Sequence, residues 1–109
     1  MVEFNDFDVE IQNERDSNPE QFTKTVTTAG VSVSVTPTSG KPIQLLYVKN
    51  PSKGPNSNNP IDVILVTVDG GANVTTVNRG EYVYIPGVFT SVSLDSNNDG
   101  TVAEVIVWS

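Results

Sequence analysis

From Phe22 to its end the chain consists of short segments rich in valine, isoleucine and threonine, separated by glycine, proline, asparagine and aspartate. β-Branched residues fit a pleated, half-buried strand, and no segment repeats its apolar residues at the period of a helix. The breaks recur about every eight to twelve residues. The sequence therefore predicts an all-β protein, an antiparallel β-sandwich of about eight strands, jelly-roll-like, with an extended N-terminal arm.

Alternation of apolar and polar residues sets the expected strand bounds. Val31, Val33 and Val35 alternate with serines, so this strand has one buried face. Residues 43–49 and 61–68 are apolar on both faces, which indicates inner strands. Because Asp69-Gly70-Gly71 suits a tight hairpin, residues 73–77 are expected to pair with 61–68. The other expected strands are 23–28, 81–85, 88–94 and 101–108, with breaks at Pro86-Gly87 and at 95–100.

The length of 109 residues suits one domain with one modest core. The chain has no cysteine, so no disulfide holds this small domain, and such domains often gain stability by oligomerisation. The residues expected in the core are Val33, Val35, Leu45, Tyr47, Val63, Leu65, Val83, Ile85, Val92, Leu94, Val105 and Val107.

The charge is uneven along the chain, whose net charge is −7. Residues 1–21 contain seven acidic residues and one basic residue, and they form the predicted acidic N-terminal arm and linker; residues 22–109 form the predicted β-sandwich domain. In the arm Phe7, Val9 and Ile11 alternate with acidic residues as in a half-buried strand, and Phe4 adds a further apolar side chain. Two interpretations remain open for residues 2–11, a partly disordered acidic tail or an arm that lies across a neighbouring subunit.

Several classes of partner and activity are disfavoured. A pI near 4.2 argues against nucleic acid and anionic membranes, and the longest apolar run is too short for a membrane span. The amino terminus lacks the basic-then-apolar pattern of a secretory signal, so we expect none. The chain has no histidine and no cysteine, which removes the commonest general base and the thiol nucleophile. We expect neither catalysis nor a cofactor.

Residues 95–101 read DSNNDGT and match the opening of a calcium loop, with Asp95, Asn97 and Asp99 as candidate ligands. The match is incomplete, because the twelfth position, which needs a bidentate glutamate, is Ile106. The same residues form good hairpin turns, and this second interpretation is favoured, so no metal is expected.

A long polar loop is expected at residues 50–60, which contain three prolines. It must lie on the surface, either as a plain loop or in contact with a ligand or partner. Most aromatic residues fall within the strand patterns. Tyr82, Tyr84 and Trp108 are the ones that could serve a sugar-binding site, although a position at the core edge or an interface is the favoured interpretation for each.

Three segments carry a family resemblance: GKPIQLLYVKN at 40–50, VTVDGG at 66–71 and TVAEVIV at 101–107. Together with the small, cysteine-free, all-β character, they make roughly residues 30–109 resemble the small virion proteins of tailed bacteriophages. The resemblance implies a capsid decoration (cementing) or head-fibre-base protein, usually a homotrimer, on the outer surface of the head. Its partners would then be the major capsid protein and itself, and its location the virion after synthesis in the host cytoplasm.

In that role residues 2–11 would bind a basic groove on the capsid, with Phe4, Phe7, Val9 and Ile11 as the contact residues. Two alternatives remain. One is a carbohydrate- or calcium-dependent adhesion module that uses the loops at 50–60 and 95–100. The other is a neck or tail structural protein of the same virus class.

Overall fold

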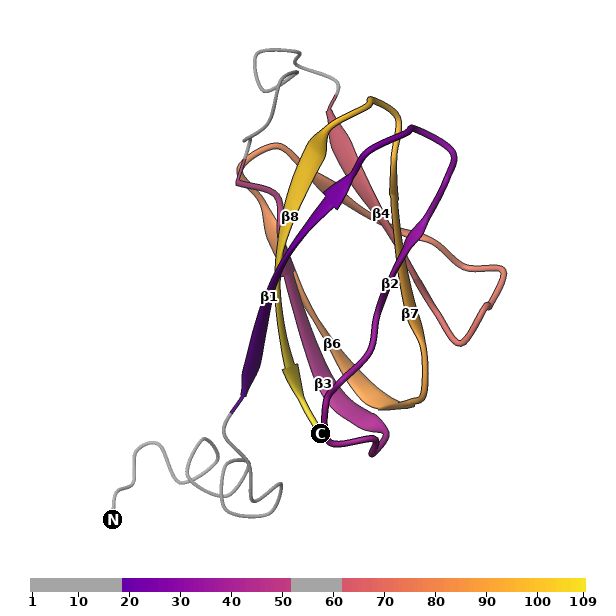
Figure 1. Ribbon diagram of the computed structural model, residues 1–109, viewed down its shortest axis with the longest axis vertical. Coiled ribbons are helices and arrows are strands. Elements are labelled where there is room, and N and C mark those ends of the chain that lie inside the picture. Colours follow the sequence, from indigo (N-terminus) through magenta and orange to yellow (C-terminus); the bar gives the residue numbers. More distant parts are fainter. Residues whose placement is uncertain (1–18, 52–61) are drawn as a thin grey trace.

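The computed structural model describes residues 19–51 and 62–109 (Figure 1). Residues 1–18 of the predicted arm and linker and nearly all of the predicted polar loop therefore lie outside the described residues, while Glu20 and Gln21, predicted as part of the linker, begin the first strand. The described part contains eight strands. They are β1 (Glu20–Val26), β2 (Val33–Val35), β3 (Ile43–Lys49), β4 (Val63–Val68), β5 (Thr75–Asn78), β6 (Tyr82–Phe89), β7 (Val92–Ser96) and β8 (Thr101–Trp108). No helix long and apolar enough to cross a membrane occurs among these residues.

The strands form two four-stranded antiparallel sheets that pack face to face (Figure 1). Sheet A has the order β1-β8-β3-β6 and sheet B the order β2-β7-β4-β5. The chain passes from one sheet to the other at every connection except that between β4 and β5. This is the strand order of an eight-stranded jelly roll, so the predicted antiparallel β-sandwich of about eight strands is confirmed.

Local sequence chemistry explains several elements directly. The bounds of β3 and β8 match the prediction, because in both strands runs of apolar and β-branched residues end at turn residues. The predicted hairpin is also present, since β5 pairs with β4. At its turn Asp69 and Gly70 have φ of 53° and 63°, and the Gly71 amide donates to the Val68 carbonyl at 3.0 Å. Positive φ at both central positions is what this turn requires.

The core lies between the two sheets, and two central strands turn a different face to it than predicted. On β3 the buried residues are Ile43, Leu46 and Val48, whereas Leu45 and Tyr47 point away from the core. On β4 the core residues are likewise Ile64 and Val66, in place of Val63 and Leu65. The buried core comprises Val26, Val35, Ile43, Leu46, Val48, Ile64, Val66, Val77, Phe89, Val92, Leu94, Ala103, Val105 and Val107.

The reason for this error is that both strands are apolar on both faces, so alternation alone leaves their phase undetermined. The predictions for Val35 and for the β7 and β8 residues are correct. Val33, Val83 and Ile85 are only partly buried and pack against the core edge. Val31 lies outside β2 and is 61% exposed.

The predicted break at Pro86-Gly87 is wrong, because β6 continues through both residues to Phe89. β6 is an edge strand, where a proline needs no partner for its missing amide hydrogen. The register with β3 pairs Leu45 with Pro86 but Ile43 with Phe89, so β6 contains one extra residue. Gly87 has φ of 145°, which favours glycine, and this bulge turns the end of β6 toward β7.

Candidate functional site

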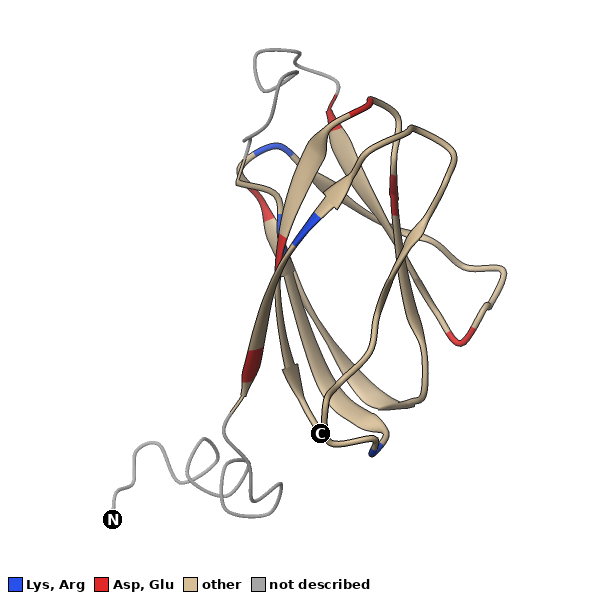
Figure 2. Cartoon of the chain, viewed as in Figure 1, with Lys and Arg blue, Asp and Glu red and all other residues tan. Residues whose placement is uncertain are grey.

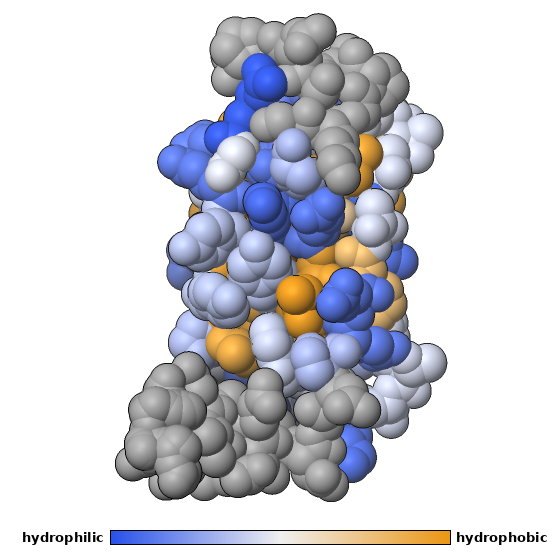
Figure 3. Space-filling view, turned by 90° about the vertical axis from the view of Figure 1, so that its left-hand side faces the viewer, coloured by the Kyte–Doolittle hydropathy of each residue, from blue (hydrophilic) through white to orange (hydrophobic). Residues whose placement is uncertain are grey.

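The outer face of sheet A carries the candidate site. Residues on each strand alternate between the core and the outside, and the register places Tyr47 of β3 between Tyr84 of β6 and Ile106 of β8. Leu45 is similarly paired with Trp108 on β8. We call this surface the aromatic face; its apolar members are Leu45, Tyr47, Tyr82, Tyr84, Ile106 and Trp108. Figure 3 looks onto this side of the molecule and shows hydrophobic side chains in the middle of the face.

Three tyrosines form a compact cluster on this face. The ring centroid of Tyr47 lies 4.9 Å from that of Tyr84 and 5.7 Å from that of Tyr82. The centroids of Tyr82 and Tyr84 are 6.0 Å apart. The Tyr82 and Tyr84 rings meet edge to face at 83°, a favourable geometry for aromatic pairs. Tyr82 and Tyr84 are nevertheless 61% and 54% exposed. A large aromatic surface therefore remains open to solvent.

Sequence reasoning identified three of these residues, Tyr82, Tyr84 and Trp108, as possible binding aromatics. It placed Tyr47 and Leu45 in the core, because it assumed the wrong phase for β3. The signal that could have corrected this was the lysine two residues after Tyr47. Lys49 shares the face of Tyr47, and a lysine is rarely placed in a core.

The outer face of sheet B is polar by contrast. Its outward residues include two apolar side chains, Val63 and Leu65, on the inner strand β4. These are surrounded by Ser34, Thr67, Thr76, Asn78, Ser93 and Asp95. The two outer faces of one small sandwich thus differ in character, and sheet A carries the one suited to contact.

One row of charge crosses the aromatic face. Lys49 on β3 is the register partner of Glu104 on β8, and the same row continues to Tyr82 on β6 and to Thr23 on β1. Figure 2 shows basic and acidic segments close together in this part of sheet A. The face therefore combines apolar side chains with one charge of each sign near its midline.

The sheet edges are poorly suited to adding another strand. On edge strand β1, Lys24 points to the inner side, opposite the buried Ala103, and its Nζ lies 5.4 Å from the Phe22 ring centroid. On β6 the extra residue and Pro86 interrupt the ladder. The remaining edge strands, β2 and β5, are only three and four residues long. Inward charges, bulges, prolines and short strands all hinder edge pairing, so contact through a face is favoured.

The residues that matched a calcium loop connect three loops at one end of the sandwich. The Oδ1 atom of Asp95 accepts from the Gly30 amide at 2.9 Å, and that of Asp99 accepts from the Ala29 amide at 2.7 Å. The Oδ1 atom of Asn97 accepts from the Val63 amide at 3.0 Å. Each of the three candidate ligands therefore has an oxygen that accepts a backbone hydrogen bond from a segment distant in sequence.

Further hydrogen bonds stabilise the same end, where Figure 2 shows acidic residues gathered at the top of the sandwich. The Asn98 side-chain amide donates to Asp62 Oδ1 at 2.6 Å. The buried Thr101 hydroxyl donates to the Asn98 carbonyl at 2.9 Å and accepts from the Ser96 hydroxyl at 2.8 Å. Asp62, Ser96 and Thr101 are all nearly inaccessible to solvent. This network gives the turn a structural role.

At the opposite end of the sandwich, Asp69 connects the β4–β5 turn to the β6–β7 turn. Its Oδ1 atom accepts from the Thr90 amide at 2.8 Å, from the Ser91 amide at 3.2 Å and from the Thr90 hydroxyl at 3.2 Å. The pKa of Asp69 is lowered from its ordinary value of 3.8, chiefly because the Thr90 amide donates a hydrogen bond to the carboxylate. Desolvation of the carboxylate raises the pKa and so partly opposes this shift.

This shift predicts an acid-dependent loss of stability. Because the pKa of Asp69 is lowered in the folded state, its contribution is present above 3.8 and is lost as the pH falls through the folded pKa. Asp69→Asn keeps an oxygen acceptor and tolerates the positive φ, but cannot titrate. The melting temperature of the variant should therefore fall less than that of the wild type between about pH 5 and about pH 2. Parallel curves for the two proteins would contradict this.

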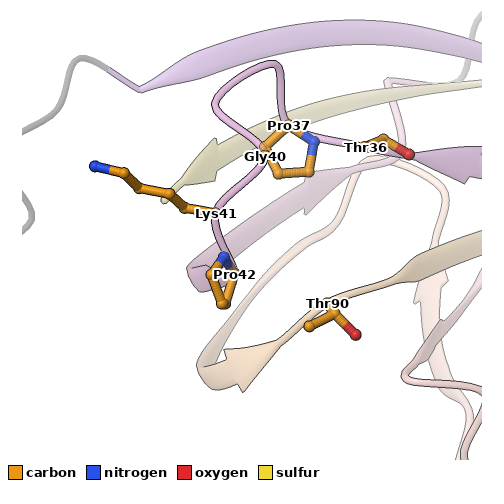
Figure 4. A pocket seen from close by; sticks show the side chains of 6 residues that line it. All are labelled: Thr36, Pro37, Gly40, Lys41, Pro42 and Thr90. Atoms are coloured by element: carbon orange, nitrogen blue, oxygen red, sulfur yellow. The ribbon is translucent and has the colours of Figure 1, made fainter.

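A small open cavity lies beside the β2–β3 connection (Figure 4). It has a volume of about 110 Å³, and its lining comes from Thr36, Pro37, Gly40, Lys41, Pro42 and Thr90. Ligand pockets usually enclose roughly 300 to 1,000 Å³, so this cavity could hold only a few water molecules. Across residues 19–51 and 62–109, no three acidic side chains gather closely enough to hold a metal ion.

The predicted partner-contact residues Phe4, Phe7, Val9 and Ile11 lie outside the described residues. No protein-family model matches the chain, and no curated protein sequence is similar to it. Among solved structures, the chain is similar to a protein of unknown function from Rhizobium leguminosarum bv. viciae 3841. The identity is 18% and the TM-score 0.42, over 99% of this chain and 96% of that chain.

Proposed function

We propose that this protein is a non-catalytic structural protein that acts by protein–protein contact, as a decoration (cementing) protein on the outer surface of a tailed-phage head. The observation that carries the proposal is the contrast between the aromatic face of sheet A and the polar outer face of sheet B. Interface cores are enriched in tyrosine and tryptophan, and such residues contribute most of the binding energy.

The fold supports this role mechanically. Both ends of the sandwich are held by carboxylate-to-backbone hydrogen bonds, from Asp95 and Asp99 at one end and from Asp69 at the other. A rigid module loses little conformational entropy when it binds. In this proposal the aromatic face makes contacts within the assembly, and the acidic residues 2–11 attach the module to the major capsid protein. The resemblance in the sequence is what points to a phage head in particular.

The test is deletion of residues 1–12, followed by mixing of the purified protein with tailed-phage virions that lack it. The deleted protein should keep its melting temperature, because β1 begins at Glu20, but should no longer sediment with the virions. A matched pair separates the loss of the phenylalanine rings from a general effect of substitution near the N-terminus: Phe4→Ser with Phe7→Ser should abolish attachment, whereas Asn5→Ser with Asn13→Ser should not. Full attachment of the deleted protein would overturn the proposed role of the arm.

Immunogold microscopy of the same particles distinguishes the head from the neck and the tail. Label spread over the head surface supports a decoration protein. Label confined to the neck or tail would replace this proposal with the alternative of a neck or tail structural protein. Complete absence from purified virions would overturn the virion proposal as a whole.

A carbohydrate-binding adhesion module is the second candidate, favoured by the exposed rings of Tyr82 and Tyr84. Its test is retardation of the protein in gels that contain polysaccharide, with Tyr82→Ala as the variant. A calcium-dependent form would use Asp95, Asn97 and Asp99, whose Oδ1 atoms already accept backbone hydrogen bonds. We therefore expect no rise in melting temperature with calcium; a rise that Asp99→Ala removes would favour the adhesion module.

A further inference from the structure

We infer that the aromatic face is covered by a second copy of the same chain, packed face to face about a twofold axis parallel to the strands. This inference rests on the proposed function only in taking the face to be an assembly surface, and it replaces the homotrimer that the resemblance implies with a twofold pair.

The strand order gives the face an internal symmetry. The midline of sheet A runs between β8 and β3, with β1 outside one and β6 outside the other. A twofold axis along this midline, in the plane between two facing sheets, lays β8 of one copy over β3 of the other. It also lays β1 over β6. All four strands of each sheet are therefore opposed by a strand of the partner.

The register then makes the two surfaces complementary in charge. Lys49 and Glu104 are register partners on either side of the midline. The twofold operation exchanges their positions, so each Lys49 lies over the partner's Glu104 and no like charges meet. Charge complementarity of this kind favours one relative orientation of two surfaces and disfavours orientations that bring like charges together. An axis perpendicular to the strands would instead lay β8 over β8 and β3 over β3, which separates these opposite charges.

The apolar rows are complementary under the same operation. Tyr47 lies over the partner's Ile106, and Leu45 over the partner's Trp108, because these are also register pairs across the midline. Tyr84 would cover the outward position of Gln21 on β1, which shares the row of Ile106. An aromatic ring thus opposes an aliphatic or polar side chain in each row, and the exposed tyrosine surface is removed from water.

The size of the face predicts the strength of the contact. Four strands about 4.8 Å apart and about seven residues long, at roughly 3.3 Å per residue, cover about 19 by 23 Å. Two such faces bury roughly 900 Å² in total, below the range of about 1,200 to 2,000 Å² of stable complexes and within that of weak, transient contacts. We therefore expect a weak, reversible dimer that dissociates on dilution.

Sedimentation equilibrium of the full chain over a range of concentrations tests the inference. The wild type should show a monomer–dimer equilibrium, and Tyr84→Lys should weaken it by tenfold or more. Thr76→Lys is the matched control, because Thr76 is an exposed outward residue on edge strand β5 of the other sheet. This control adds the same charge and should leave the dimer unchanged. Melting temperatures measured at high dilution verify that each variant is folded.

A charge exchange tests the twofold geometry itself. Lys49→Glu and Glu104→Lys should each weaken the dimer, because each brings like charges together across the interface, and the double variant should restore it. The same exchange also preserves the pair within each sheet. The dissociation constant reports the interface, while the melting temperature of the dilute monomer reports the internal pair.

Three results would overturn the inference: a monomer at all concentrations, a trimer, or equal weakening by Tyr84→Lys and Thr76→Lys. Its failure is distinguishable from that of the proposed function. A monomer that still binds virions would refute the second copy but retain the decoration role. A dimer that never associates with virions would retain the second copy and refute the decoration role.

Discussion

Replacing Leu46 by alanine is expected to lower the free energy of unfolding by about 2 to 5 kcal/mol, because it opens a cavity in a closely packed core. Leu46 is fully buried near the middle of β3, between β8 and β6 of the same sheet. A loss of that size is a large part of the stability of a domain of this length. Urea denaturation, followed by the fluorescence of Trp108, measures it.

The neighbouring leucine provides the matched control. Leu45 has the same side chain in the same strand but points to the aromatic face, where it is only partly buried. Leu45→Ala should cost about 1 kcal/mol or less, since no closed cavity forms at a surface. Equal losses of stability in the two variants would contradict the described phase of β3, and a larger loss in Leu45→Ala would indicate the reverse phase.

Replacing Asn50 by alanine is expected to cost about 2 to 4 kcal/mol, because buried carbonyl groups would be left without a donor. Asn50 follows β3 and is completely buried. Its side-chain amide donates to the carbonyls of Asp62 at 3.3 Å and Val77 at 3.2 Å. It therefore connects the end of sheet A to the start of β4 and to β5 in sheet B.

The backbone of Asn50 is bonded as well: its amide donates to the Glu81 carbonyl at 2.9 Å, and its carbonyl accepts from the Gly80 amide at 2.8 Å. These bonds survive the substitution, so the variant isolates the side chain. Asn73→Ala, at an exposed position between β4 and β5, is the control and should change the stability by less than about 0.5 kcal/mol. An equally small change in Asn50→Ala would show that water replaces the lost amide.

The candidate site was only partly predictable from the sequence. Tyr82, Tyr84 and Trp108 could be identified because they are the aromatic residues for which a position at the core edge, an interface or a binding site was expected. Tyr47 joined them only in the fold, because the phase of β3 depends on which of its two apolar faces the opposite sheet covers. The calcium-like segment shows the same limit. Its oxygens are used by Ala29, Gly30 and Val63, which are distant in sequence.

The sequence by itself determined the fold class, the approximate place of most strands and the turn at Asp69-Gly70, since these follow from side-chain branching, alternation and positive φ within a few residues. The tertiary structure alone decided the pairing of β1 with β8, the faces of β3 and β4 and the continuation of β6 through Pro86. These depend on contacts between residues far apart along the chain. An edge position makes the proline harmless, and a two-sided apolar strand takes its phase from the sheet packed against it.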